Sequence, residues 1–163
     1  MTDQPNYSIT LCKPSELSLA EQERCMTIVR EGSAIQNDRY IKQNFPNAKT
    51  LAVVRASTGE IVGVGALKAP NPVHTRTVCD RSGETFDHNR TELGYVAVDG
   101  NHRGKKLSYS IVEHLHSSTK EPLFATTDCP RMKKVLTSNG FSNEGQSWKG
   151  DRGDLTLWLK SQR

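Results

Sequence analysis

The sequence contains no long hydrophobic run, and this absence narrows the class of protein that it can encode. None of its apolar segments approaches the roughly 20 residues that a membrane-spanning helix needs. No charged segment followed by an apolar one opens the chain, so we expect no secretory leader. Hydrophobic residues make up only 34% of the chain, but they recur in periodic blocks. The sequence therefore predicts a folded, soluble, cytoplasmic protein with a single domain over residues 7–163, preceded by a disordered tail over residues 1–6.

The sequence also lacks the patterns with which cysteine and histidine usually hold metals. No C-x-x-C pair, no H-E-x-x-H motif and no Cys/His pairing at zinc-finger spacing occurs. The four cysteines are widely spaced, at Cys12, Cys25, Cys79 and Cys129. Reduced thiols in the cytoplasm are the simplest interpretation. A zinc site built from distant residues such as His74, Cys79 and His88 is the less favoured alternative, so no metal is expected.

Strong charge of one sign is missing as well. The formal net charge of +4 suits an anionic ligand but is too small to indicate nucleic acid. One small basic cluster without interleaved aromatic residues is weak support for a nucleic-acid surface. We therefore regard nucleic acid as an unlikely partner.

Local patterns predict the element order β-α-α-β-β-β-α-β-α-β-β. Ser18 and Glu21 have the spacing of a capping box, Asn37 or Asp38 caps a second short helix, and Pro130 suits the first turn of the last helix. Residues 69–91 have no clear period and are predicted to form a long loop or irregular hairpin. The predicted strands cover residues 7–11, 51–54, 61–67, 92–98, 123–127, 146–149 and 154–159. This order predicts a mixed sheet with helices on both faces.

The segment from Glu92 to Leu115 is the most informative part of the chain. It changes from a buried strand to an amphipathic helix within about ten residues, a change from period 2 to period 3.6. The loop between them contains Arg103, Lys105 and Lys106. Cations at a helix N-terminus oppose the helix dipole, and a bound polyanion explains their presence. The loop is therefore a predicted phosphate or pyrophosphate site.

The element order and three motifs resemble the Gcn5-related N-acetyltransferase (GNAT) family. The motifs are the loop Val98–Ser108, the turn Ser138–Phe141 and the closing strand Leu155–Leu159. The loop resembles the family's phosphate-binding motif, in which Arg103 fills the first position. Lys106 and Ser108 stand where the family usually has small residues. At two further family positions, an Asn and a Tyr are replaced by Cys129 and Leu136.

The resemblance implies an α/β (α+β) fold in a single GNAT-like domain. Its central sheet would be mixed, mostly antiparallel and twisted, with about seven strands and about four flanking helices. It further implies an acetyl-CoA-dependent N-acetyltransferase, in which a primary amine of a small molecule or a protein attacks the thioester directly. The residues that it implies for coenzyme binding are Val96, Ala97, Val98, Arg103, Gly104, Lys105, Lys106, Leu107 and Ser108.

Two residues are candidates for the proton transfers. Glu92 begins the central strand, where the resemblance places a general base, and a carboxylate at the edge of an apolar cleft would have a raised pKa. It is otherwise a surface glutamate at a strand end. Cys129 is a candidate proton donor to the departing thiolate, although free cysteine more often packs as a small apolar residue. The usual donor position holds Leu136.

Two alternatives stay open at this point. Because Leu136 replaces the usual tyrosine, a non-catalytic acyl-CoA-binding sensor or interaction module of the same fold is the main alternative. The sequence does not identify the amine acceptor. We expect residues 31–47 and 69–91 to determine which amine is accepted. Trp148 and Trp158 on the last hairpin are candidates for a homodimer contact.

Overall fold

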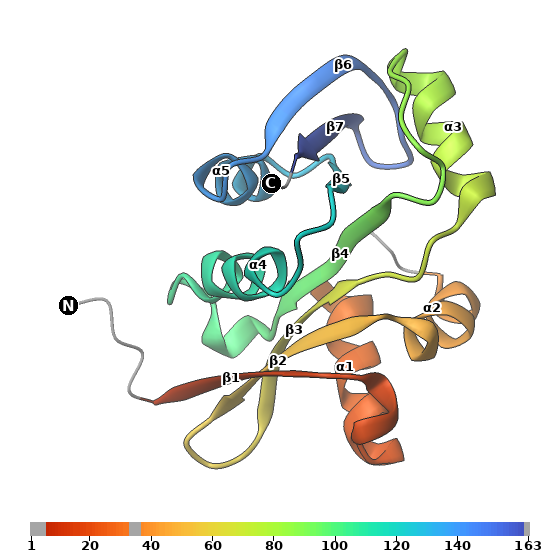
Figure 1. Ribbon diagram of the computed structural model, residues 1–163. Coiled ribbons are helices and arrows are strands. Elements are labelled where there is room, and N and C mark those ends of the chain that lie inside the picture. Colours follow the sequence, from red (N-terminus) through yellow and green to blue (C-terminus); the bar gives the residue numbers. More distant parts are fainter. Residues whose placement is uncertain (1–5, 33–36, 162–163) are drawn as a thin grey trace.

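A seven-stranded sheet organises the computed structural model, which describes residues 6–32 and 37–161 (Figure 1). Its strand order is β1-β2-β3-β4-β5-β7-β6, and all neighbouring pairs are antiparallel except β4 and β5. The strands are β1 (Tyr7–Cys12), β2 (Thr50–Ala56), β3 (Ile61–Leu67), β4 (Thr91–Val98), β5 (Leu123–Thr127), β6 (Ser142–Lys149) and β7 (Asp154–Lys160). The predicted mixed, mostly antiparallel sheet is confirmed. The predicted tail lies, but for its last residue, outside the described residues.

Five α-helices cover the two faces of the sheet: α1 (Leu19–Gly32), α2 (Asp38–Asn44), α3 (Pro72–Ser82), α4 (Leu107–Ser117) and α5 (Pro130–Ser138). One core lies between the sheet and α4 and α5, and it includes Ile111, Leu115 and Leu136. A second core lies under α1 and α2, around Ile28 and Phe45. The prediction of helices on both faces is therefore confirmed.

The helix ends that the sequence predicted are present. Ser18 accepts a hydrogen bond from the amide of Glu21, whose carboxylate accepts one from the amide of Ser18, so the capping box at α1 forms. Asn37 caps α2 by accepting from the amide of Tyr40. Gly140 follows α5 with a φ of 85°, the left-handed conformation typical of a helix C-terminus.

Helix α3 contradicts the prediction of a loop or irregular hairpin over residues 69–91. The side chain of Asn71 accepts a hydrogen bond from the amide of His74, Pro72 occupies the first turn, and Gly83 ends the helix with a φ of 80°. These are ordinary start and stop signals. They were missed because only one short stripe of α3 is buried, so its hydrophobic period is weak. The chain consequently has five α-helices in the described residues instead of about four.

The last hairpin also differs from its prediction. β6 begins at Ser142 rather than residue 146, and its pairing with β7 shifts register between Glu144 and Trp148. Trp158 is buried, with its indole N–H donated to the hydroxyl of Thr156. Trp158 is thus a core residue, and its suggested role in a dimer contact is wrong.

Strands β4 and β5 lie side by side over only a short distance. Their parallel pairing is confined to Thr91 with Leu123 and Glu92 with Phe124. On the other side of β4, the pairing with β3 shifts register between Val64 and Ala66, and Tyr95 has a φ of 56°. A bulge of this kind bends a strand. The two central strands therefore separate beyond Glu92. No helix in the described ranges combines the length and apolar character that crossing a membrane would require.

Candidate active site

A cleft of about 930 Å³ opens where β4 and β5 separate. All of β4 from Glu92 to Val98 lines one wall, and Ala125 to Thr127 of β5 contribute to the opposite wall. The last turn of α1 and the first turn of α5 also border the cleft. Its size is within the range of ligand sites in proteins. The predicted coenzyme-binding strand residues Val96, Ala97 and Val98 all lie in its wall.

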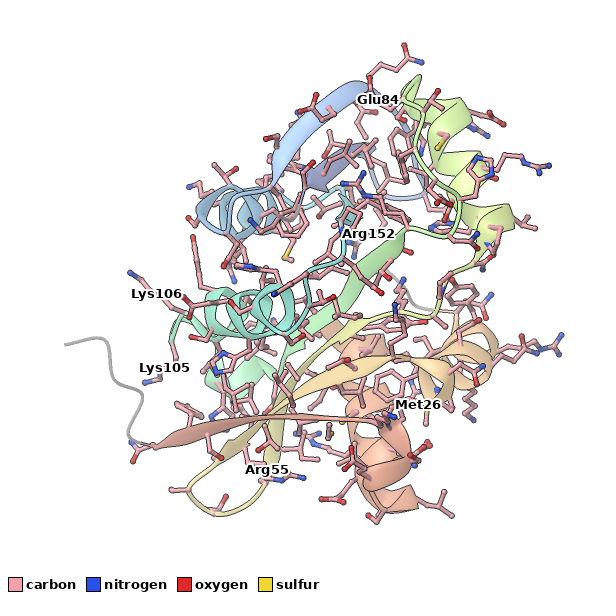
Figure 2. All side chains as sticks on the ribbon, viewed as in Figure 1. Met26, Arg55, Glu84, Lys105, Lys106 and Arg152 are labelled. Carbon is pink, nitrogen blue, oxygen red and sulfur yellow. The ribbon has the colours of Figure 1, made fainter. Side chains whose placement is uncertain are left out.

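One end of the cleft meets the N-terminus of α4. Arg103 and Ser108 line the cleft there. Figure 2 shows the side chains of Lys105 and Lys106 extending outward from the start of α4. Lys106 is the N-cap residue, and no capping hydrogen bond from its side chain is found in the described structure. First-turn amide N–H groups of a helix have no intrahelical acceptors, so this end can receive an anion.

Lys106 explains why the family usually has a small residue at this position. Its backbone is left-handed, with a φ of 60°. Glycine adopts this conformation without strain, whereas other residues do so at a cost. Lys106 retains the turn and adds an exposed cation at the start of α4.

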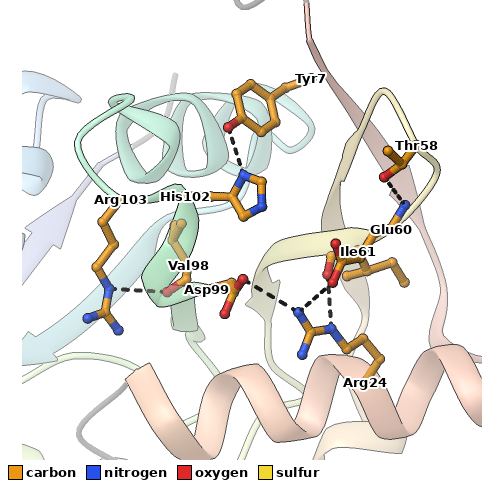
Figure 3. A network of polar contacts seen from close by, with 9 residues as sticks. All are labelled: Tyr7, Arg24, Thr58, Glu60, Ile61, Val98, Asp99, His102 and Arg103. Atoms are coloured by element: carbon orange, nitrogen blue, oxygen red, sulfur yellow. Dashed lines mark hydrogen bonds and ion pairs between the residues drawn. The ribbon is translucent and has the colours of Figure 1, made fainter.

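Polar contacts to two other parts of the fold, β1 and α1, hold the loop after β4 in place (Figure 3). The ring of His102 hydrogen-bonds the hydroxyl of Tyr7 in β1 at 2.8 Å. The Asp99 carboxylate lies 3.8 Å from the Arg24 guanidinium of α1, which also donates to the carbonyl of Ile61. His102, which the sequence marked only as a loop residue, is therefore an anchor. A rigid loop lowers the entropy lost on binding.

The side chain of Arg103 is exposed but bends back toward β4. Its Nε donates to the carbonyl of Val98 at 3.3 Å, so its guanidinium folds back along the cleft (Figure 3). A methyl group added at Gly32 of α1 would lie 3.3 Å from the Arg103 guanidinium and the same distance from the Ala97 side chain. The end of α1 thus approaches β4 closely and confines Arg103.

At the other end of the cleft, the structure brings three ionisable side chains together. Oε1 of Glu92 lies 3.6 Å from Nζ of Lys68 and 3.3 Å from Nε2 of His74. Glu92 is not a surface residue: its side chain is only 12% exposed. Burial acts to raise the pKa of Glu92, but the charge of Lys68 and the contact with His74 outweigh it and hold the pKa below its ordinary value. The expectation of a raised pKa is therefore wrong, because it omitted both partners.

Lys68 is placed by the strands on either side of it. Its amide donates to the carbonyl of Glu92, and its side chain crosses over Gly94. A Cβ at Gly94 would lie 2.6 Å from Cε of Lys68, so only glycine leaves this space. The ammonium then lies 4.3 Å from the centre of the Tyr95 ring, within the range of a cation–π contact.

The other candidate catalytic residue, Cys129, lies at the N-cap of α5 and lines the cleft. It is exposed rather than buried, so the interpretation as a packing residue is wrong. Its neighbour Asp128 pairs with Arg152 of the last hairpin at 2.9 Å. Leu136 is fully buried and also contributes to the wall. The role of Cys129 as a proton donor stays a prediction.

Sequence reasoning missed several residues of the cleft. Lys68 and His74 fell in or beside the segment interpreted as a loop, and Tyr95 was interpreted only as a strand residue. The hydroxyl of Tyr95 is buried, and among the described residues it has no hydrogen-bond partner. The Asn71–Pro72 start of α3 could have placed His74 on a helix. No local sequence signal could have predicted that Lys68 lies beside Glu92. No cluster of three potential metal ligands is found within the described ranges.

The chain belongs to the Acetyltransferase (GNAT) family, whose sequence model matches residues 18–133. No functionally curated protein matches the chain significantly. The family transfers acetyl groups from acetyl-CoA.

Solved structures share the fold. A GNAT-family acetyltransferase from Streptococcus agalactiae is 14% identical, with a TM-score of 0.71 over 95% of this chain and 96% of that one. A protein from Corynebacterium glutamicum described as histone acetyltransferase HPA2 and related acetyltransferase is 18% identical, with a TM-score of 0.67 over 96% and 97%. Spermidine N-acetyltransferase from Vibrio cholerae, in complex with CoA and spermine, is 13% identical, with a TM-score of 0.63 over 94% and 95%. At these identities the likeness establishes the fold alone.

Proposed function

We propose that this protein is an acetyl-CoA-dependent N-acetyltransferase that acetylates a primary amine by direct attack on the thioester. The observation that carries the proposal is the cleft formed by the separation of β4 and β5, with a helix N-terminus at one end and a buried carboxylate at the other. A diphosphate fits the first end, and an amine fits the second.

The coenzyme would be held mainly by backbone groups. At the start of α4, the amides of Leu107 and Ser108 point toward an anion, and Arg103 supplies a charge beside them. Gly104, Lys105 and Lys106 are exposed in the same loop and are the further residues proposed to contact the coenzyme. Along β4, Val96, Ala97 and Val98 lie beyond the last residue paired with β5 in the described structure. Their backbone groups on that side are available for the amides and the carbonyl of an acyl thioester.

Glu92 is the proposed proton acceptor. Its lowered pKa keeps it ionised throughout the neutral range, so it is in the form that accepts a proton from the acceptor ammonium, but it is a weaker base than a carboxylate with a raised pKa. The neutral nitrogen then attacks the carbonyl carbon, a C–N bond forms, and the C–S bond breaks. The thiolate that leaves takes up a proton, for which Cys129 is the proposed donor at the cleft.

Titration calorimetry with acetyl-CoA tests the coenzyme half of the proposal. We expect saturable binding at submillimolar concentration. Arg103→Ala should weaken it about tenfold, the value of one charge-assisted contact of about 1.4 kcal/mol. Lys149→Ala is the matched control, because it removes an exposed cation from the last hairpin and should leave the affinity unchanged. Equal affinity for all three proteins would show that the loop does not bind the coenzyme.

Release of the free thiol in the presence of a panel of amines tests the catalytic half. We expect at least one amine to give turnover, and Glu92→Gln to reduce it on the order of 100-fold without a comparable loss of coenzyme affinity. Binding without thiol release for any amine, including peptide and protein amines, would instead identify a non-catalytic acyl-CoA-binding protein.

A further inference from the structure

The cleft already contains an amine of the protein itself. Lys68 is the one lysine that lines the cleft in the described part of the chain. Its side chain is only 11% exposed, and its ammonium faces the carboxylate of Glu92 and the ring of Tyr95. A carboxylate that accepts a proton and an aromatic face that attracts a cation are the groups that an acceptor amine needs. Lys68 therefore lies where an external acceptor would be recognised.

The contact between Lys68 and Glu92 is an ion pair without a hydrogen bond. The 3.6 Å between Nζ and Oε1 of Glu92 is too long for a direct hydrogen bond. The lysine stem crosses over Gly94, where no Cβ obstructs it, and both Gly94 and Val96 line the cleft. Val96 lies two residues further along β4, about 7 Å away. The flexible four-carbon stem of lysine can cover most of this distance by bond rotation.

We infer that Lys68 is an intramolecular acceptor, so that the protein acetylates its own cleft lysine from acetyl-CoA. The inference rests on the proposed function. Glu92 takes a proton from the Lys68 ammonium, and the neutral Nζ attacks the thioester carbonyl. A C–N bond forms, the C–S bond breaks, and coenzyme A leaves as the thiol after taking up a proton. The product is a neutral acetamide at residue 68, which no longer pairs with Glu92.

This modification would change the site itself. Acetylation removes the positive charge that faces Glu92 and adds an acetyl group to a side chain that already lies over Gly94. An external amine would then meet a neutral, bulkier group beside Glu92. We therefore expect the acetylated protein to turn over external amines more slowly than the unmodified protein, with coenzyme affinity retained because Arg103 and α4 are not altered.

Peptide mass spectrometry after incubation with acetyl-CoA tests the inference. We expect one acetyl group at Lys68, gained with a first-order rate constant that does not change when the protein is diluted. The exposed Lys120 and Lys149 report ordinary chemical acetylation and should gain the group much more slowly. Glu92→Gln should slow the reaction at Lys68 on the order of 100-fold and leave the two control lysines unchanged.

A matched variant of Lys68 distinguishes the effect of its positive charge from its capacity to be acetylated. Lys68→Arg keeps the cation but has no amine to acetylate, because guanidinium does not deprotonate in proteins. It should bind acetyl-CoA normally and gain no group at residue 68. Three outcomes would overturn the inference: an unmodified Lys68 in a protein that binds acetyl-CoA and acetylates amines, a rate at Lys68 no higher than at the control lysines, or a rate that rises with protein concentration. Absence of acetyl-CoA binding by calorimetry would overturn the proposed function as well.

Discussion

Replacing Lys68 with methionine should destabilise the protein far more than replacing a lysine of a shorter ion pair. The substitution keeps the length of the side chain but leaves the buried carboxylate of Glu92 without its main counter-charge. Removing one partner of a buried pair costs roughly 3–5 kcal/mol. The side chains of Lys68 and Glu92 are 11% and 12% exposed, so little solvent screening reduces this value. We expect a loss of about 3 kcal/mol in the free energy of unfolding at pH 7.

The matched control is Lys49→Met. Nζ of Lys49 lies only 2.7 Å from the Glu121 carboxylate, but the two side chains are 37% and 52% exposed. An exposed pair contributes about 1 kcal/mol or less. Distance would rank this pair as the stronger one, whereas burial ranks it as the weaker one. Urea denaturation of the two variants decides between these rankings, and equal losses would refute the argument from burial.

The pH dependence gives a second readout on the same variant. In the native protein the pKa of Glu92 is lowered, so its stabilising contribution is complete above its ordinary pKa of 4.5 and is lost as pH falls through the lower folded value. In Lys68→Met, burial dominates and raises that pKa. The stability deficit of the variant should therefore shrink between pH 7 and pH 5, and adding Glu92→Gln should restore most of the loss. A deficit that is constant with pH would contradict the electrostatic explanation.

Three further predictions follow from backbone geometry and protonation. Gly145→Ala should lower the free energy of unfolding by more than about 2 kcal/mol, because the added Cβ would lie 2.5 Å from the carbonyl oxygen of Ser82 at a φ of 73°. The control Gly59→Ala, at a φ of 91° with open space around it, should lower it by only about 1 kcal/mol. Equal urea midpoints for the two variants would refute the argument from this contact. Lys106→Gly should raise stability by about 1 kcal/mol by relieving the left-handed backbone, and a lower midpoint would show that side-chain contacts outweigh this strain. Because the lowered pKa keeps Glu92 ionised, kcat/KM should rise with pH only as the acceptor amine deprotonates. A rise in the pH profile of kcat/KM between about pH 6 and 8 that disappears in Glu92→Gln would contradict this prediction.

The parts of the fold that were predicted correctly depend on contacts between near neighbours in the sequence. The Ser18–Glu21 capping box and the Gly140 helix end involve residues within one turn of each other. The strand and helix around the phosphate loop were recognised from the change of hydrophobic period at Leu107. Such signals survive in a single sequence because no distant residue is needed to form them.

The errors concern features that depend on the rest of the molecule. Helix α3 buries only a short stripe against β6 and β7, so its sequence has a weak period although Asn71 and Gly83 mark both ends. Trp158 could be assigned to a strand but not to a face, because its burial depends on helices packed far along the chain. Cys129 was expected to pack and is instead exposed at the cleft.

The sequence by itself determined the strands, four of the five described α-helices and the family resemblance, because periodicity, capping and loop composition are local properties of the chain. Only the tertiary structure decided the chemistry of the cleft. The pairing of β3 with β4 places Lys68 beside Glu92, and α3 adds His74 to the same carboxylate. The separation of β4 from β5 opens the cleft that this carboxylate lines. A pKa is set by every charge and every layer of atoms around a group, and folding assembles these from distant parts of the chain.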